Sequence, residues 1–381
     1  MRFQPSEEQA RIRDRVRTLV REEIAPRASG IDEEGRYPRE NLERLAGLGL
    51  LGMLVPASLG GTGTGTVAYA FALSEIAGGC ASTSLGMAVS NLVGEAIAKY
   101  GGGEQKERLL PDLVSGRMSG AFALTEPSAG SDARSIETTA VRDGDGYVLN
   151  GVKAFVTNGT EAGAAVVMAV TGKEPGKRIS AFLVDPAAAG ITAGKPERKM
   201  GLRGSATVTL IFDDCRVPVK NLLGREGEGF RIAMQTLDGG RIGIAAQAIG
   251  IARAAIGAAT AFSRERERAG GPDARTAAVW GMIADSATEL DAAELLALRA
   301  AGRKDAGLPF TREASIAKVF ASEAGYRASH RAVQAFGEEG CVRGCPAERH
   351  LRDVKVASLY EGTSEVQRTV ISRGMLGEAG R

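Results

Sequence analysis

The residue best suited to acid–base chemistry is a glutamate near the end of the chain, Glu361. It lies in a short loop, residues 359–363, between apolar residues and the expected start of a helix capped by Thr363 or Ser364. A lone glutamate before a helix is usually solvated, where it interacts favourably with the helix dipole. A partly desolvated carboxylate has a pKa nearer to neutral and can act as a general base. The residue types alone leave both interpretations open.

A second candidate is an arginine, Arg241, that falls on an apolar stripe. Phe230, Met234 and Leu237 recur at i, i+4 and i+7, as on one face of a helix, and Arg241 continues the stripe at i+11. A buried arginine is costly unless it is paired or faces a ligand. The position therefore indicates either a ligand-facing arginine or one that is salt-bridged within its own helix.

Three regions of different periodicity must position these side chains. Up to about residue 116 the pattern predicts helices, with Leu42, Leu45 and Leu48 at three-residue spacing. Short β-branched runs and a turn signal at residues 143–146 then predict a β domain with a hairpin. Long helices return from about residue 226. We expect a mainly α chain with a central β domain, divided at residues 1–116, 117–225 and 226–381.

Composition argues against several functional classes. The net charge is only +2 over 381 residues, and charges of both signs are interspersed, so no nucleic-acid footprint is expected. No apolar run reaches the length of a membrane span, and the N-terminus lacks a signal-peptide core, which predicts a cytoplasmic protein without membrane insertion. Cys341 and Cys345 lack a matching second pair of ligands, so no metal site is expected.

Several segments, in order and over nearly the whole chain, resemble the acyl-CoA dehydrogenase family. They are residues 122–132, 150–159, 200–207, 237–247, 264–272, 334–341 and 360–368. The resemblance implies a helical N-terminal domain, a β-barrel-like middle domain and a C-terminal four-helix bundle. It also implies an FAD held between the last two domains and across a subunit interface, in a homo-oligomer that we expect to be a tetramer.

The resemblance also assigns roles to residues. The FAD contacts that it implies come from five of the segments: Phe122, Leu124, Thr125, Gly130, Ser131, Phe155, Val156, Thr157, Arg266, Gln334, Gly337, Glu338, Thr363 and Glu365. Arg266 would reach the FAD pyrophosphate of a neighbouring subunit. The substrate contacts that it implies are Ser131, Asp238, Arg241, Tyr360 and Gly362.

The reaction implied by the resemblance is the α,β-dehydrogenation of an acyl-CoA to a trans-2-enoyl-CoA. Glu361 would remove the α-proton while the flavin accepts the β-hydride. The backbone N–H of Glu361 and a flavin hydroxyl would stabilise the enolate-like oxygen. Electrons would then pass to an electron-transfer flavoprotein. Residues 238–247 resemble the short-chain members of the family in particular.

Four positions depart from the family pattern. Phe155 stands where the family usually has Trp, Ala269 stands for Phe, Ala277 for Gln, and Glu338 for Gly near the FAD diphosphate. These departures keep two alternatives open. One is a flavoenzyme of the same fold that acts on carrier-protein-bound acyl groups or uses oxygen. The other is an FAD-poor structural subunit of a hetero-oligomer.

Overall fold

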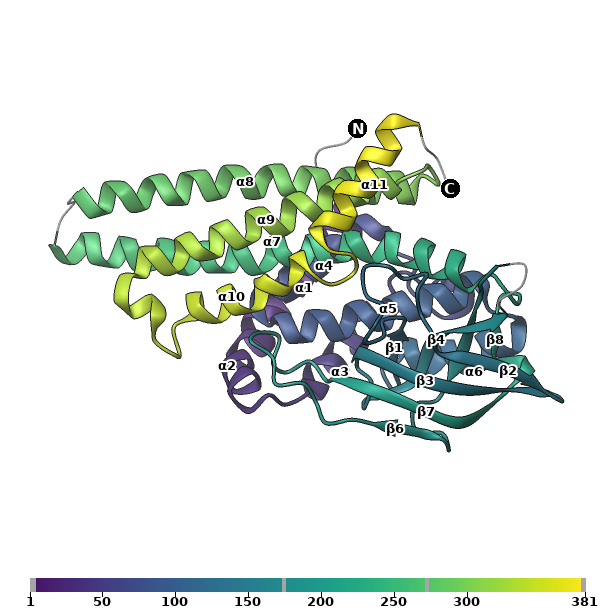
Figure 1. Ribbon diagram of the computed structural model, residues 1–381. Coiled ribbons are helices and arrows are strands. Elements are labelled where there is room, and N and C mark those ends of the chain that lie inside the picture. Colours follow the sequence, from purple (N-terminus) through teal and green to yellow (C-terminus); the bar gives the residue numbers. More distant parts are fainter. Residues whose placement is uncertain (1–4, 173–175, 271–273, 378–381) are drawn as a thin grey trace.

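The N-terminal region is helical in the computed structural model, which describes residues 5–172, 176–270 and 274–377 (Figure 1). Its helices are α1 (Glu7–Leu19), α2 (Ala25–Glu34), α3 (Arg39–Gly47), α4 (Gly65–Gly79), α5 (Ala81–Tyr100) and α6 (Gly103–Val114), with short helical turns η1 (Val20–Ile24), η2 (Leu50–Gly52) and η3 (Ala57–Leu59). Helix α1 begins with a capping box between Ser6 and Gln9. Leu42 and Leu45 are buried on α3, so the predicted helical spacing is confirmed.

The middle region is one β-sheet. Its strands are β1 (Ser119–Ala123), β2 (Thr139–Asp143), β3 (Gly146–Thr157), β4 (Ala162–Gly172), β5 (Arg178–Val184), β6 (Ile191–Ala193), β7 (Thr207–Pro218) and β8 (Leu222–Leu223), with the turn η4 (Val219–Asn221) before the last. They follow the order β6-β7-β3-β2-β4-β5-β8, and β1 pairs with β4. Asp143 pairs with Gly146 across a two-residue turn, which confirms the predicted hairpin.

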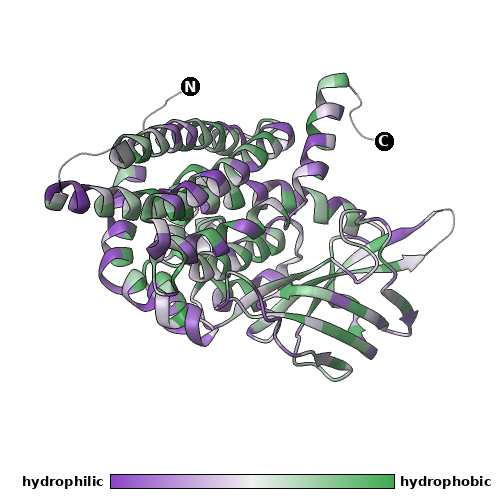
Figure 2. Ribbon diagram, turned by 60° about the vertical axis from the view of Figure 1, so that its left-hand side comes forward, coloured by the Kyte–Doolittle hydropathy of each residue, from purple (hydrophilic) through white to green (hydrophobic). Residues whose placement is uncertain are grey.

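The C-terminal region is again helical. It consists of α7 (Gly229–Gly270), α8 (Ala274–Asp305), α9 (Thr311–Phe336), α10 (Pro346–Val354) and α11 (Ser364–Leu376), with short turns η5 (Gly337–Cys341) and η6 (Lys355–Ser358). The three long helices α7, α8 and α9 run lengthwise against one another, and α10 lies on α7 and α9 (Figure 1). Helix α11 packs on α9 and projects from the rest of the molecule (Figure 2). The predicted order of helices, β domain and helices is confirmed, whereas the predicted domain limits stay predictions.

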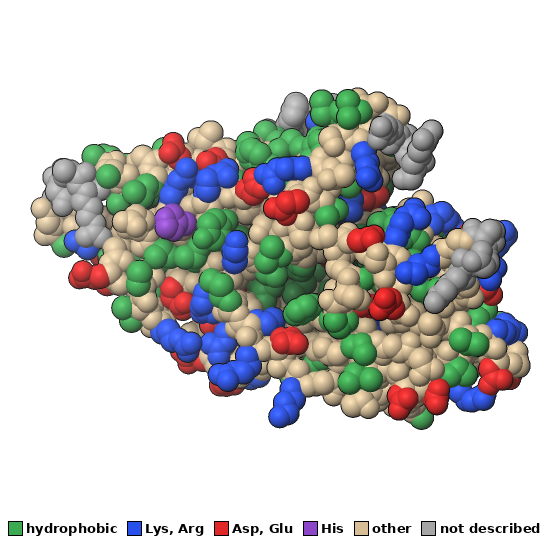
Figure 3. All heavy atoms as spheres, in the orientation of Figure 1, with side chains coloured by type: hydrophobic (Ala, Val, Ile, Leu, Met, Phe, Trp, Pro, Cys, Tyr) green, Lys and Arg blue, Asp and Glu red, His purple; other side chains and the backbone are tan. Residues whose placement is uncertain are grey.

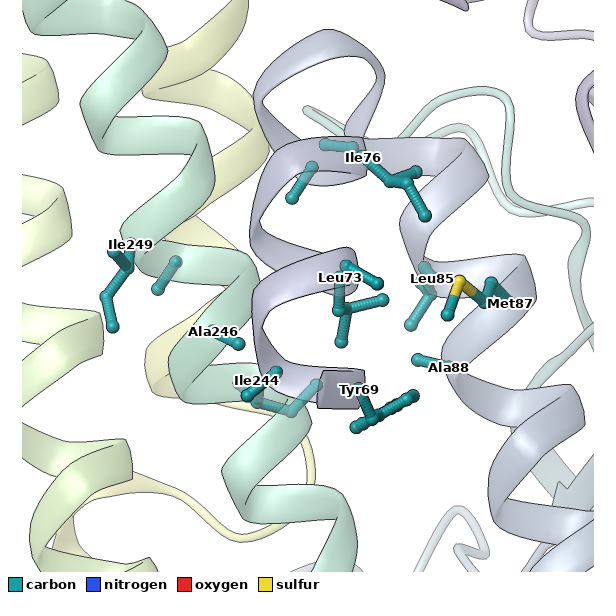
Figure 4. Packing of buried hydrophobic residues seen from close by; sticks show 14 of the residues in the cluster. Tyr69, Leu73, Ile76, Leu85, Met87, Ala88, Ile244, Ala246 and Ile249 are labelled. Carbon is teal, nitrogen blue, oxygen red and sulfur yellow. The ribbon is translucent and has the colours of Figure 1, made fainter. Parts of the chain in front are cut away.

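Helix α7 is the central helix of the fold and contacts helices of both helical regions. It is the one helix in the described residues that is long and apolar enough to cross a membrane, but 78% of its apolar window is buried inside the protein, as in a core helix. Figure 4 shows how it is buried: Ile244 and Ala246 of α7 lie on the side that faces α4, and Leu73 of α4 points towards Leu85 of α5. Helix α5 thus lies close to both α7 and strand β1, where it can position groups from the bundle and from the sheet.

Candidate active site

Glu361 occupies the loop between η6 and α11, with its carboxylate withdrawn from water. Its Oε2 atom is buried and has no hydrogen-bond partner. Burial raises the pKa of this carboxyl to about 7, and the cations of Lys318 and Arg241 oppose that rise. The solvated interpretation of Glu361 is therefore wrong for its side chain. A desolvated carboxylate that titrates near neutral pH is suited to general-base chemistry.

The local backbone directs Glu361 inward. Glu361 has φ +52° and Gly362 has φ +93°, so two consecutive residues are left-handed. Thr363 then caps α11 by accepting a hydrogen bond from the N–H of Val366 at 3.4 Å, so the first of the two predicted caps is the one used. The tight loop places the glutamate directly before the helix and turns its side chain towards α7.

A glycine on α7 provides the space for the carboxylate. A Cβ added at Gly240 would lie 2.1 Å from Oε2 of Glu361 and 2.8 Å from Cδ1 of Leu92 on α5. Gly240 follows the acidic and small residues of segment 237–247, whose glycines the sequence alone did not assign to any task. The close approach shows that Glu361 lies against α7, with α5 on the other side.

Arg241 takes the salt-bridged alternative that the sequence left open, and its contact with a ligand stays a prediction. It is 5% exposed, and its Nη1 donates to Asp238 at 2.5 Å and to Ser315 at 3.4 Å, so it is salt-bridged within its helix. Its Nε atom is buried without a partner and remains free to donate. Burial raises the pKa of Asp238 although Arg241 lowers it. The positive charge of Arg241 lowers the pKa of Glu361, against the larger effect of burial.

Apolar and aromatic groups from α4 and α5 close the space beside Glu361. A Cβ added at Gly243 would lie 3.0 Å from the Tyr69 hydroxyl and 3.4 Å from Cδ2 of Leu73. Burial and then the charge of Glu361 raise the pKa of Tyr69 above its ordinary range, which indicates that the phenol and the carboxylate are neighbours. Figure 3 shows a hollow with hydrophobic side chains between the helices and the β domain. The apolar side chains of Leu73 and Leu92 therefore lie close to the part of α7 that contacts the base.

The predicted flavin segment after β1 is held by a buried ion pair. Lys153, which is 0% exposed, donates to Glu126 at 2.6 Å and to the carbonyl of Leu124 at 3.0 Å. Glu126 also accepts the N–H groups of Glu137 and Thr138 at 2.6 and 3.0 Å. This pairing fixes the loop that follows β1. Phe122 near the end of β1 and Leu124 and Thr125 in the loop are half-buried, while Gly130 and Ser131 are exposed. Glu126 and Lys153 lie within two of the segments that resemble the family, but their positions in the sequence do not indicate this pairing.

A bulge in β3 presents an aromatic ring to the outside. The pairing of β3 with β7 shifts register between Lys153 and Val156, and Phe155 has φ +54° with 66% of its surface exposed. The N–H of Ala154 donates to the carbonyl of Thr125 at 2.9 Å, which joins the bulge to the loop after β1. Val156 is 1% exposed, so only its backbone remains for a cofactor contact. Thr157 follows, half-buried.

The flavin segments and Glu361 converge on α5. Asn158, directly after β3, donates to the carbonyl of Gly120 on β1 at 3.0 Å, and the N–H of Gly120 donates to Ser90 of α5 at 3.3 Å. Leu92, two residues further along α5, is the side chain beside Gly240 and Glu361. An exposed ring at Phe155 and open space beside Gly130 fit a flat aromatic group at this face. The residues present therefore fit FAD.

The remaining predicted cofactor contacts lie at the other end of the bundle. Arg266 is exposed near the end of α7, with its guanidinium 5.7 Å from the ring of Phe262, which stacks on Phe336 at 4.5 Å. Gln334, Gly337 and Glu338 lie at that same end of α9, with Gln334 and Glu338 exposed. At 1.5 Å per residue, Arg266 is roughly 39 Å along α7 from Gly240. One chain alone does not bring these residues to Glu361.

Tyr360 and Glu365, two further predicted contacts, flank the loop of Glu361, and the departures Ala269 and Ala277 lie on the surface. The Tyr360 hydroxyl donates to Gln247, whose amide donates to Ser84 at 2.7 Å, so the residue before the base is tied to α7 and α5. Glu365 is exposed at the start of α11. Ala269 and Ala277 are exposed near the α7–α8 connection, and Gly271 and Pro272 of the segment 264–272 lie outside the described residues.

Sequence analysis missed two buried polar residues beside the base, Lys318 and Gln367. Both are 0% exposed, and both donate to the backbone of the loop that carries Glu361. The available signal was weak: Lys318 interrupts a run of small residues, Ala314, Ser315 and Ala317, on α9. Gln367 lies within residues 360–368, but its residue type alone indicates no role.

Known proteins match the chain over nearly its whole length. Residues 6–117, 121–215 and 227–376 match the N-terminal, middle and C-terminal domains of acyl-CoA dehydrogenases. The human mitochondrial short-chain specific acyl-CoA dehydrogenase is 48% identical over 362 residues, covering 94% of this chain and 88% of that protein. Butyryl-CoA dehydrogenase of Megasphaera elsdenii has a similar structure, with TM-score 0.95, 39% identity, and coverage of 99% and 100%. Glutaryl-CoA dehydrogenase of Mycobacterium smegmatis in complex with FADH2 gives TM-score 0.92, 30% identity, and coverage of 99% and 96%.

Proposed function

Because this chain belongs to the acyl-CoA dehydrogenase family of FAD-dependent oxidoreductases, we propose that Glu361 removes the α-proton of a short-chain acyl-CoA, which becomes the trans-2-enoyl-CoA. One observation carries the proposal: the Oε2 atom of Glu361 is buried and unpaired, while burial raises the pKa of the carboxyl to about 7. A carboxylate oxygen that is buried without a hydrogen-bond partner is poised to accept a proton.

The groups around Glu361 have separate roles in the proposed reaction. The thioester carbonyl oxygen accepts a hydrogen bond from the backbone N–H of Glu361, which acidifies the α-carbon. Arg241 and Lys318 stabilise the ionised base through their charge. The apolar side chains of Leu73 and Leu92 exclude water from the carboxylate and orient the acyl chain. Asp238, Ser131, Tyr360 and Gly362 remain proposed substrate contacts.

FAD is the proposed acceptor of the β-hydride. When bound, it supplies a two-electron acceptor, which no side chain of this protein provides. Phe155, Thr157 and residues 122–131 would hold it. Gln334, Gly337, Glu338 and Arg266 would contact the FAD of another subunit, since they lie at the far end of the bundle. This division supports a homo-oligomer, which we propose to be a tetramer.

The acyl group is proposed to be short. Tyr69 and Leu73 stand close to Gly243 of α7 and limit the space beyond the base. The similarity to a short-chain specific relative and to butyryl-CoA dehydrogenase supports the same substrate class. An electron-transfer flavoprotein is proposed as the acceptor of the electrons, and the cytoplasm as the location.

The test is anaerobic reduction of the bound flavin by acyl-CoA esters of increasing chain length. Wild-type protein is expected to bleach with butyryl-CoA. Glu361→Gln is expected to bind FAD and ligand but to bleach about 10²–10⁴-fold more slowly, because the general base is lost. Wild-type bleaching by Glu361→Gln would refute the role of the glutamate.

Two further outcomes distinguish the alternatives. Rapid formation of hydrogen peroxide in air would favour an oxygen-using enzyme, and bleaching only by carrier-protein thioesters would favour the carrier-linked one. A colourless protein that does not take up added FAD would favour the structural subunit.

A further inference from the structure

We propose that Lys318 and Gln367 are positioning residues that hold the catalytic loop by its backbone carbonyls, with Lys318 also supplying a fixed positive charge to the base. The inference rests on the proposed role of Glu361. Lys318 comes from α9 and Gln367 from α11, so two helices that carry no other proposed substrate contact converge on one loop.

The contacts form a clamp on two consecutive peptides. The Lys318 ammonium donates to the carbonyl of Gly362 at 2.7 Å. The Gln367 amide donates to the carbonyls of Glu361 and Gly362 at 3.2 and 3.1 Å. Three hydrogen bonds from buried donors therefore reach two neighbouring carbonyl oxygens. Holding both carbonyls fixes the peptide planes that follow Glu361, and with them the direction of its side chain.

The loop needs such a clamp because its backbone is strained. Glu361 is a non-glycine residue at φ +52°, a conformation that L-residues adopt at a cost in energy. Gly362 has φ +93°, and a Cβ at this position would lie 2.3 Å from the Gln367 amide nitrogen. The glycine is thus required both by its backbone and by the approach of Gln367. Without the donors, the loop would relax away from the left-handed conformation that aims the carboxylate at α7.

The charge of Lys318 is directed at the same residue. Among the carboxylates that raise the pKa of Lys318, Glu361 has the largest effect, followed by Glu365 and Glu323. Burial lowers the pKa of Lys318 to about 8, so the ammonium form is the main one at neutral pH. Lys318 in turn is the cation that lowers the pKa of Glu361 most. The hydrogen bonds to the loop and the charge of Lys318 therefore both influence Glu361.

The other groups around Glu361 differ in kind from Lys318. Helix α4 contributes the Tyr69 phenol, whose pKa is also raised by the charge of Glu95 on α5. Helix α7 presents Arg241, whose charge is partly balanced by Asp238. Tyr360 precedes the base and is bonded to Gln247. None of these groups is seen to bond the carbonyls of Glu361 or Gly362 in the described part of the chain.

The experiment compares Lys318→Met and Gln367→Met with a matched control. Lys199→Met is the control, because Lys199 also donates to a backbone carbonyl at 2.7 Å, that of Ser205, on the β domain. Both clamp variants are expected to lower the rate constant of anaerobic flavin reduction by butyryl-CoA by about 10²-fold, since displacing a reacting group by about 1 Å has that effect. KM, FAD content and the Lys199→Met rate are expected to stay unchanged.

The pH profile of the rate distinguishes the effect of the Lys318 charge from the effect of the hydrogen bonds to the loop. Lys318→Met is expected to move the rising limb of the rate to higher pH, because the base loses its stabilising cation. Gln367→Met removes no charge, so the rising part of its pH profile is expected to stay at the wild-type pH while its rate of flavin reduction falls. A second readout is the ultraviolet absorbance of enolised acetoacetyl-CoA, which binds but is not dehydrogenated. Both variants are expected to bind it less as the enolate, because the loop that carries the base and its N–H is no longer held by the two carbonyls.

The inference would be overturned if both variants kept the wild-type rate, the wild-type pH profile and the wild-type enolate absorbance. It would also be overturned if only KM changed. If Lys318→Met fails to fold, Gln367→Met alone decides by the rate and the enolate absorbance. An inactive Glu361→Gln beside unaffected clamp variants would refute only the clamp. A fully active Glu361→Gln would refute the proposed function itself.

Discussion

Gly240 offers the most direct test of how closely Glu361 lies against α7. A Cβ at this position would lie 2.1 Å from Oε2 of Glu361, whereas ordinary contact begins at 3.4 Å. The carboxylate in Gly240→Ala must therefore retreat by about 1.3 Å, and a displacement of about 1 Å costs about 10²-fold in rate. We expect stopped-flow flavin reduction by butyryl-CoA to slow by at least that factor.

The control lies on the same helix. Gly257 on α7 has nothing within 4 Å of an added Cβ, so Gly257→Ala is expected to keep the wild-type rate. Both substitutions replace glycine by the better helix former, which favours the folded state by about 1 kcal/mol in a helix interior. A slow Gly240→Ala with an undiminished melting temperature would therefore reflect the moved carboxylate. A Gly240→Ala protein that reduces its flavin at the wild-type rate would refute the placement of Glu361 against α7.

Three further predictions concern the base and the ties between regions. The rate of flavin reduction is expected to rise with pH through about 7, since Glu361 must be ionised and burial raises its pKa to that value; a limb at the ordinary glutamate pKa of 4.5 would contradict its burial. Lys153→Met is expected to destabilise the protein by about 3–5 kcal/mol in urea unfolding, because Glu126 would stay buried without its cation; the double variant Lys153→Met/Glu126→Gln is expected to recover part of that loss, because the neutral amide needs no cation and its oxygen can still accept the N–H of Glu137. Arg352→Ala is expected to cost about 1.5–3 kcal/mol, since Arg352 joins Asp32 of α2 to the carbonyl of Met200; an unchanged unfolding midpoint would contradict that tie.

Local signals in the sequence were sufficient wherever neighbouring residues decide the structure. The turn between Asp143 and Gly146 and the cap at Thr363 follow from short-range hydrogen bonding, and both were predictable. Arg241 was recognisable because a charge on an apolar stripe is costly unless it is paired. The pairing with Asp238 is itself local, at i and i+3.

The clamp was not predictable in the same way, because it is assembled from distant parts of the chain. Lys318 precedes Gly362 by 44 positions, and nothing in its own helix indicates that its ammonium will meet a carbonyl there. The bulge at Phe155 likewise depends on the register of β3 with β7. Arg266 and Gln334 were assigned by resemblance alone, and the single chain leaves them far from the base. Such residues become visible only when the helices are packed.

The pKa of Glu361 is best understood as a balance that the fold sets. Burial alone would push the carboxyl further towards its neutral form, in which it could not accept a proton. Lys318 and Arg241 oppose this effect, and the resulting pKa is about 7. The two cations are not equivalent: Arg241 shares its charge with Asp238, whereas the largest influence of any carboxylate on Lys318 is that of Glu361 itself. Lys318 is therefore the group whose loss should most readily leave the base protonated at neutral pH, and the fold places it where the same ammonium also fixes the loop.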